Sequence, residues 1–383
     1  MRPNKKKKKD LAVFHRIIDS KILESRNMNS FAFWYEKEAR STNPMNAIVH
    51  FNLFCECGWK GPVLDIGLLI EDITVAQRLK IFLPFNVAGN TIGDHIEDLG
   101  IRLQNGNILD ALFNNNYRII NQNEKYFRAE NLYDKTDKFT VYCPDIEKDI
   151  ELEPFSAGDM VEVGTTIIIN TANIVLATKD YDVKKCYLRL RIKNHDLGFL
   201  IHRYSLPNTA LQNILKTTYM VDFRYNNTRS LSKSLIEEMR NSKCAIPQVK
   251  ELHFLLITKA YVNVSETAFS RVRMIEHNVW AQYVADNEKE ERDTTELVAY
   301  HYIDYNEEGK AEKNGMYPSE LFTKFQVEKS VAVWYIVLTV LLGALGSGVA
   351  AVIQRLFFNS SSHVLADILT AIQSIQSILE RLP

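Results

Sequence analysis

The sequence lacks the short motifs by which many enzymes are identified. It has no GxxxxGK[ST] phosphate loop, no GxGxxG dinucleotide fingerprint, no GxSxG nucleophile elbow and no HExxH metal motif. Each motif holds a backbone or side-chain group against a substrate or metal, so nothing here indicates a P-loop nucleotide hydrolase, a dehydrogenase, an α/β-hydrolase or a zinc protease. We therefore predict no cofactor, and the sequence names no catalytic residue.

Cysteine is also sparse, with five in 383 residues. Cys143, Cys186 and Cys244 stand singly in apolar or strand-like runs, which is typical of reduced core thiols in a reducing compartment. Cys55 and Cys57 have the spacing of half a zinc site, but no second CxC or CxxC pair completes it. We expect no metal site.

The chain has no excess of charge, because its formal net charge is −1. It therefore gives no general argument for a nucleic-acid partner. The basic run Lys5–Lys9 is not followed by the apolar core of a signal peptide, since Asp10 and Arg16 interrupt the segment that would have to serve. We expect this run to be a solvated tail, with binding to anionic lipid or nucleic acid as the alternative. The large N-terminal part is expected to be cytosolic.

One long apolar run is present, Val331–Ile353, with Lys329 before it and Arg355 after it. A helix of about 23 residues, rising about 1.5 Å per residue, reaches about 34 Å and can cross a hydrocarbon core. The alternative is a buried helix in a large soluble core. We predict a single transmembrane helix in a lipid bilayer. More basic residues precede the helix than follow it: Lys310, Lys313, Lys324 and Lys329 before it, and Arg355 and Arg381 after it. This difference favours a cytoplasmic N-terminal head.

The residues before this helix predict an α+β, mostly antiparallel, β-rich head. In Cys186–Lys193 apolar and basic residues alternate, so Arg189, Arg191 and Lys193 are expected on a solvated strand face. Further strands are expected at 219–225 and 249–264, with a hairpin of 272–284 and 296–305. Helical spacing occurs at 11–26, 94–104, 108–113 and 230–241.

We expect six segments in chain order. They are a basic tail and helix (1–30), a first α+β lobe (31–155), a second β-rich lobe (156–306), a juxtamembrane connector (307–330), the transmembrane helix (331–354) and an amphipathic or coiled-coil tail helix (363–382).

Histidines and carboxylates offer two candidate sites. His253, His277 and His301 could converge in a folded sheet, although independent surface or packing histidines are the alternative. Asp94 and Asp98 could share a helix face and bind a cation, but such clusters are typical of a capped, solvated helix start.

Two patterns at the C-terminal end favour a homo-oligomer. Small or weakly polar residues form one stripe of the membrane helix, along which helix backbones can approach closely: Thr339, Gly343, Ser347, Ala350 and Gln354. Apolar residues of the tail are spaced alternately three and four apart, as in a coiled coil: Leu365, Ile368, Ile372, Ile375, Leu379 and Leu382. An amphipathic helix on the membrane surface is the alternative, but the polar face has no lysine.

Together these features predict a membrane-anchored, self-associating sensor or effector. Its cytosolic head would bind a protein partner or a small-molecule signal, and binding would cluster or rearrange the membrane helices. The layout resembles that of membrane-anchored effectors of bacterial antiviral systems, a likeness of arrangement that no motif carries. A membrane-tethered hydrolase or nuclease with scattered catalytic residues is the alternative.

Overall fold

The computed structural model describes residues 29–39, 41, 43–55, 62–87, 92–156, 164–180, 183–193, 197, 199–204, 216–265, 268–284, 295–306, 316–328, 332–358 and 364–379. The basic run Lys5–Lys9, the helix predicted at 11–26 and Cys57 lie outside these residues. The chain divides into two compact units, which are described separately. The first, called the head below, is Met1–Ser205 with Thr217–Val327, and the second is Leu206–Lys216 with Glu328–Pro383.

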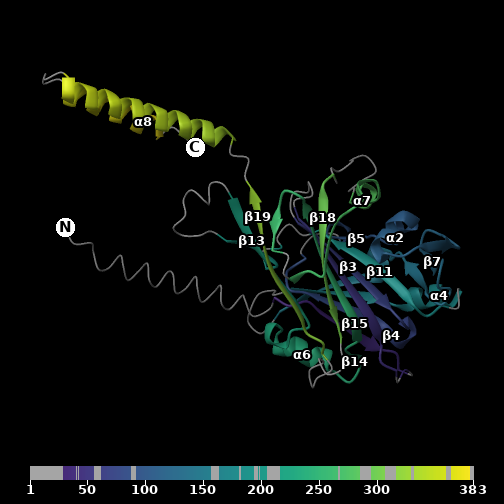
Figure 1. Cartoon of the computed structure of the whole chain (residues 1–383). Helices are drawn as coiled ribbons and strands as arrows, with labels where there is room; N and C mark the ends of the chain where they lie inside the picture. The colour runs from purple at the N-terminus through teal and green to yellow at the C-terminus, as the bar shows by residue number, and fades with distance from the viewer. Residues whose placement is uncertain are drawn as a thin grey trace. The chain divides into compact units, whose positions relative to one another are not determined.

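Two large sheets make up most of the head (Figure 1). The five-stranded sheet is antiparallel, in the order β14 (Cys244–Ala245), β1 (Ala32–Lys37), β4 (Ala76–Leu83), β10 (Gly164–Asn170) and β9 (Ile150–Phe155). The ten-stranded sheet has the order β17 (Arg271–Met274), β18 (Leu297–Tyr305), β15 (Gln248–Lys259), β2 (Asn46–Phe54), β3 (Val63–Ile70), β11 (Cys186–Ile192), β8 (Lys138–Tyr142), β7 (Tyr126–Asn131) and β6 (Tyr117–Ile120), and β5 (Ile96–Asp98) pairs with β11. The pairs β2–β15 and β8–β11 are parallel.

A third sheet of four strands has the order β12 (Ile201–Tyr204), β13 (Lys216–Tyr225), β19 (Ser319–Glu328) and β16 (Asn263–Val264). The described α-helices of the head are α2 (Gly106–Phe113), α3 (Ile146–Asp149), α4 (Ala172–Asp180), α6 (Lys233–Met239) and α7 (His277–Val284). Single 3₁₀ turns are η1 (Ile73–Val75), η2 (Ile92–Asp94), η3 (Ile101–Gln104) and η4 (Thr228–Ser230). The predicted α+β, β-rich head is confirmed.

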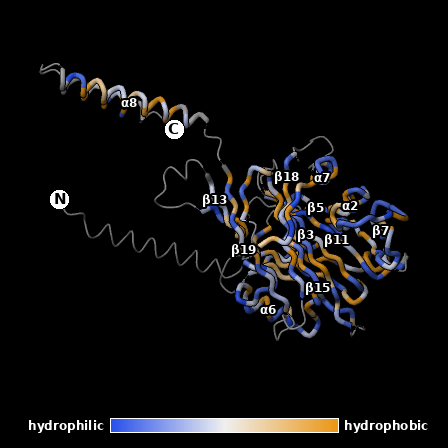
Figure 2. Tube along the Cα trace, viewed as in Figure 1, coloured by the Kyte–Doolittle hydropathy of each residue, from blue (hydrophilic) through white to orange (hydrophobic). Residues whose placement is uncertain are grey.

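Alternation along the strands gives the ten-stranded sheet two buried faces. Val49 and Phe51 of β2 belong to the main core, which also contains Ile81 of the five-stranded sheet. Side chains one residue out of step point to the opposite face, where a second core includes Leu109 of α2 and Trp280 of α7. Figure 2 shows apolar residues concentrated along the strands. Because both faces are covered there, polar residues of the second face such as Asn52, Asp65 and Arg189 are buried.

The two predicted lobes, 31–155 and 156–306, share their sheets. The parallel pair β2–β15 joins strands from the two sides of that boundary, as do the pairs β4–β10 and β3–β11. Apart from residues 206–216, both ranges belong to one compact unit. The chain returns repeatedly to the same sheets, so the described residues of the two ranges share a core.

Two predicted elements differ from the structure. The helix expected at 94–104 is the strand β5 between two 3₁₀ turns, because Ile96 and Asp98 pair with β11. The strand expected at 272–284 ends at Met274, and its remainder is the helix α7. Trp280, Tyr283 and Val284 are buried on one side of α7, at the three- and four-residue spacing of a helix.

Part of the predicted connector also belongs to the head. Within 307–330, residues Ser319–Glu328 form β19, whose burial alternates: Leu321 and Phe325 are buried, whereas Phe322 and Lys324 are exposed. This two-residue period is that of a strand covered on one face. The predictions of α2 at 108–113 and of α6 within 230–241 are confirmed.

The second unit contains the helices α8 (Ala332–Phe358) and α9 (Val364–Leu379). Within α8, Val337–Arg355 is long and apolar enough to cross a membrane, with a mean hydropathy of 2.0. Figure 2 shows the apolar residues along α8. A Cβ added at Gly343 would meet no other group within 4 Å, and Ile372 of α9 is 55% exposed. Both residues are therefore uncovered in the single chain.

Candidate functional site

A cavity of about 540 Å³ lies on the second face of the ten-stranded sheet. Neighbouring strands β2, β15, β18 and β17 supply its floor, and α2 with the turn after it and α7 supply its walls. The lining residues that carry polar or aromatic groups are His50, Asn52, Phe113, Asn114, Asn115, Tyr117, Asp137, Lys185, Glu251, His253, Arg271, Arg273, Trp280, His301 and Tyr305. A concave site of this size with converging polar groups is typical of small-molecule binding.

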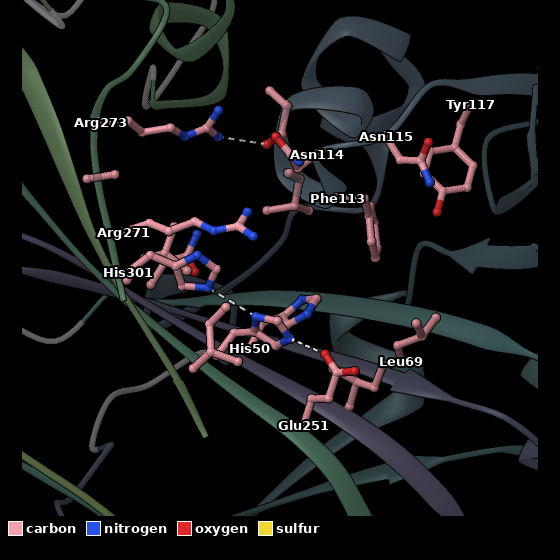
Figure 3. A pocket seen from close by; sticks show the side chains of 18 of the residues that line it. His50, Leu69, Phe113, Asn114, Asn115, Tyr117, Glu251, Arg271, Arg273 and His301 are labelled. Atoms are coloured by element: carbon pink, nitrogen blue, oxygen red, sulfur yellow. Dashed lines mark hydrogen bonds and ion pairs between the residues drawn. The ribbon is translucent and has the colours of Figure 1, made fainter. Parts of the chain in front are cut away.

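Strand pairing brings three histidines together in this cavity. His50 of β2 lies opposite His253 in the parallel pair β2–β15, and their rings are 4.8 Å apart in an edge-to-face arrangement. His301 of β18 stacks on His253 with a centroid separation of 5.2 Å. Figure 3 shows His301 directed toward the same cluster. The predicted convergence of His253 and His301 is thus observed, whereas His277 begins α7 and does not line the cavity.

A carboxylate and two of these histidines form a hydrogen-bonded chain. His253 Nε2 is 3.0 Å from Glu251 Oε2, and His253 Nδ1 is 3.0 Å from His301 Nε2 (Figure 3). Glu251 and His253 are two residues apart on β15 and therefore share a face. An imidazole held by a carboxylate in this way has a defined orientation, which is a property of many binding and catalytic histidines.

The histidines are uncharged at neutral pH. Burial, together with the nearby His253 and the guanidinium groups of Arg271 and Arg273, lowers the pKa of His301 to about 4. Burial, with His253 and Arg189 close by, holds the pKa of His50 well below its ordinary value. Burial also lowers the pKa of His253, although its hydrogen bond to Glu251 acts in the opposite direction. The cavity therefore contains neutral imidazoles, which can accept hydrogen bonds.

Three cationic side chains line the same cavity. Lys185 is paired with Asp137 at 2.8 Å. Arg273 donates to the Ala111 carbonyl at 3.2 Å and lies 3.8 Å from a Glu276 carboxylate oxygen. Within the described part of the chain, no carboxylate forms an ion pair with Arg271, which lies opposite His301 in the β17–β18 pair. The arginines of β17 thus supply positive charge that the protein neutralises incompletely.

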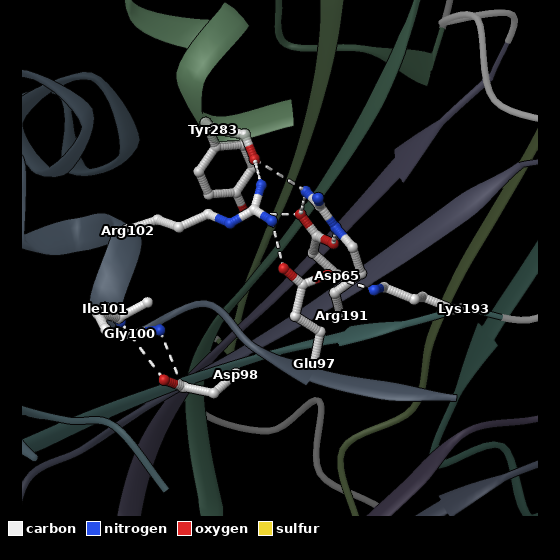
Figure 4. Close-up of polar contacts among 9 residues, drawn as sticks. All are labelled: Asp65, Glu97, Asp98, Gly100, Ile101, Arg102, Arg191, Lys193 and Tyr283. Atoms are coloured by element: carbon white, nitrogen blue, oxygen red, sulfur yellow. Dashed lines mark hydrogen bonds and ion pairs between the residues drawn. The ribbon is translucent and has the colours of Figure 1, made fainter. Parts of the chain in front are cut away.

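A buried charge network lies on the same sheet face. Arg191 donates to Asp65 at 2.8 Å, and Tyr283 of α7 donates to the other Asp65 oxygen at 2.5 Å (Figure 4). Arg189 is 3.7 Å from the same carboxylate and donates to the Tyr283 hydroxyl at 2.5 Å. All four side chains are fully buried or nearly so. The solvated basic face predicted for Arg189 and Arg191 is therefore wrong, because α7 and its neighbours cover it.

This network reaches the cavity through Tyr187. Arg189 Nη1 donates to the Tyr187 hydroxyl at 2.9 Å, and that hydroxyl is 3.3 Å from His50 Nδ1. A Cβ built at Gly67 would overlap the Tyr187 hydroxyl and lie 3.0 Å from Arg189 Nη1. Because Gly67 has no side chain, the Tyr187 hydroxyl and the Arg189 guanidinium group can occupy this space and form their hydrogen bond.

Lys193 and the acidic cluster of the sequence have structural partners. One carboxylate oxygen of Glu97 pairs with Arg102, and the other, Oε2, lies 2.9 Å from Lys193 Nζ (Figure 4). Asp98 accepts hydrogen bonds from the backbone of Gly100 and Ile101, and burial raises its pKa to about 7. Asp98 is thus a local cap. Among the described residues, no group of three or more His, Cys, Asp or Glu side chains has a metal-binding arrangement.

The sequence did not single out His50, Glu251 or the arginines of β17. A signal existed on β2, where His50 and Asn52, two residues apart, interrupt the apolar run of residues 47–54. Their polar character is explained by the cavity on that face. No protein-family model matches the sequence, and no curated protein matches it either. Function must therefore be inferred from the cavity itself.

Proposed function

We propose that the chain is a membrane-anchored receptor whose head binds a small anionic ligand in the cavity. The observation that carries the proposal is the placement of Arg271 and Arg273 on one edge of the cavity, beside neutral histidines. Arginine donates two parallel hydrogen bonds to a carboxylate or phosphate, and incompletely neutralised arginines in a cavity favour such a ligand.

The rest of the lining suits a ligand that also has an organic part. Phe113, the last residue of α2, has its ring centroid 5.8 Å from that of His50, and Tyr305, the last residue of β18, also lines the cavity. Aromatic rings and the aliphatic side chains of Leu69 and Leu255 offer apolar surface for that part.

Anchoring and self-association belong to the same proposal. The length and hydropathy of α8 support a membrane-spanning role, and the lysines before it support a cytoplasmic head. The exposed Gly343 and Ile372 support association of α8 and α9 between chains as a coiled-coil-like bundle. Ligand binding by the head would then cluster or rearrange these helices.

The binding step can be tested with the purified full-length chain in lipid nanodiscs. Thermal shift and calorimetry against a panel of phosphates, nucleotides and carboxylates should identify at least one anionic ligand. Arg271→Ala should weaken its binding by about tenfold or more, which corresponds to about 1.4 kcal/mol. Arg118→Ala is the matched control, because Arg118 is 62% exposed, is paired with Glu130 and lies outside the cavity. Equal loss in both variants, or no anion bound by the wild type, would contradict the proposal.

The chain Glu251–His253–His301 favours a second candidate, a membrane-tethered hydrolase. A carboxylate-oriented imidazole can remove a proton from water or a hydroxyl group. Turnover of an ester or phosphodiester by the wild type, abolished in His301→Asn, would favour this candidate over a receptor that only binds.

A further inference from the structure

We infer that the cavity recognises a phosphate monoester carrying one proton, and rejects the isosteric sulfate monoester. The structural basis is an acceptor nitrogen of His301 held beside the donor groups of Arg271 and Arg273. The inference rests on the proposed function, that the cavity binds an anion, and names the class of that anion.

The hydrogen-bonded chain has a defined direction because it begins at a carboxylate. An ionised carboxylate can only accept hydrogen bonds, so His253 Nε2 must carry the hydrogen that faces Glu251. A neutral imidazole has one donor and one acceptor, so His253 Nδ1 accepts from His301 Nε2 across 3.0 Å. The remaining nitrogen of His301, Nδ1, then carries a lone pair.

The surroundings keep His301 in this state. The pKa of about 4 means that the imidazole is neutral at pH 6–7, and the causes include the positive charges of Arg271 and Arg273. Arg271 lies opposite His301 on the adjacent strand, and in Figure 3 its guanidinium group lies beside the His301 ring. Arginine has donors only. A ligand on this edge of the cavity therefore meets cationic donors and one acceptor.

Among tetrahedral anions, this combination suits a monoprotonated phosphate. Its second pKa is about 6, so near that pH it offers anionic oxygens to the arginines and a P–OH donor to His301. Transfer of that proton to His301 would give the same overall proton count. A sulfate monoester has a similar shape and a charge of −1 but no proton to donate, so one of its oxygens would face the His301 lone pair. An unsatisfied buried acceptor costs enough to weaken binding on the order of 10- to 100-fold.

The test uses phenyl phosphate and phenyl sulfate with the full-length chain in nanodiscs of zwitterionic lipid, by calorimetry at pH 6. We expect phenyl phosphate to bind at least tenfold more tightly. Phosphate affinity should fall as the pH rises above 6, whereas sulfate affinity should rise as the pH falls toward 4 and His301 becomes protonated. Equal affinities for the two esters would overturn the inference and leave the proposed function intact. Binding of carboxylates but of neither ester would also overturn the inference alone. If the wild type bound no anion, both the inference and the proposed function would be overturned.

Glu251→Gln is the diagnostic variant. A glutamine amide can donate to His253 Nε2, which allows the chain to reverse and His301 to present N–H to the ligand. We expect phosphate binding to remain and the preference for phosphate over sulfate to shrink to about threefold or less. The reason is that the sulfate oxygen would then face an N–H group of His301 and no longer a lone pair. Glu130→Gln is the matched control, because Glu130 pairs with Arg118 outside the cavity and should leave the preference unchanged. An unchanged preference in Glu251→Gln would overturn the inference. If this variant does not fold, the pH ranges in the wild type decide the question alone: phosphate affinity should change above pH 6, whereas sulfate affinity should change only near the His301 pKa of about 4.

A phosphate monoester can belong to a soluble molecule or to a lipid headgroup. Nanodiscs containing phosphatidic acid distinguish the two: competition with phenyl phosphate would assign the site to a headgroup, and its absence to a soluble phosphate ester.

Discussion

Asp65 lies between two buried arginines, and its carboxylate holds Arg191 and Tyr283 in place. Asp65→Asn keeps the shape but removes the negative charge, so two guanidinium groups remain buried without their closest counter-charge. Breaking such a pair costs about 3–5 kcal/mol. We therefore expect a large fall in the melting temperature of the detergent-solubilised chain. Asp145→Asn, which alters an exposed carboxylate paired with Lys148, should leave it nearly unchanged, and comparable losses would contradict the assignment.

The lowered histidine pKa values make the head sensitive to acid. Between about pH 4 and the ordinary histidine pKa of about 6.5, the unfolded state binds a proton that folded His301 does not. The contribution of His301 to the free energy of unfolding is therefore fully present above pH 6.5 and is lost as the pH falls toward 4. Melting temperature measured over this range should show less pH dependence in His301→Asn than in the wild type. His202→Asn on the exposed face of β12 should behave as wild type. A wild-type stability that rises on acidification would refute the prediction.

At the scale of single elements, Ile372 of α9 is 55% exposed in the single chain, and the spacing of the apolar residues in the tail predicts that it packs between chains. We expect Ile372→Asp with Ile375→Asp to reduce chemical cross-linking of full-length chains in a bilayer steeply, because each charge would face its symmetry mates. Burial of one such side chain is worth roughly 1.5–3 kcal/mol per chain. Gln373→Asp with Ser377→Asp adds the same charge away from the stripe and should leave cross-linking intact. Monomeric wild type would leave α8 as a plain anchor.

At the scale of the whole molecule, the proposed topology places the head and α9 on opposite sides of the membrane. A cysteine introduced at the exposed Thr136 should react with a membrane-impermeant maleimide only when the cytoplasmic side is open. A cysteine at Ser377 should react from the other side. Labelling of both from one side would show that α8 does not span the membrane.

Local patterns predicted the elements whose signal is local. The period-two alternation of 186–193 identified β11, the helical spacing of 108–113 identified α2, and the charge-free run identified α8. Trp280 and Tyr283 stand at helical spacing, yet the strand-like composition around them predicted a strand. The same residue types suit both structures, so packing against the second core decided between them.

The sequence by itself determined a β-rich head, an apolar helix near the C-terminal end and an amphipathic helix after it, because these depend on the order of apolar and polar residues within one turn or one strand. Only the tertiary structure decided which faces of the strands are exposed to solvent. Arg189 and Arg191 alternate as a solvated face would, but α7 covers them. The cavity also needed the fold, since the parallel pairing of β2 with β15 brings His50 beside His253, two residues about 200 positions apart in the chain. Such long-range pairing depends on the packing of both sheets, and no local pattern encodes it.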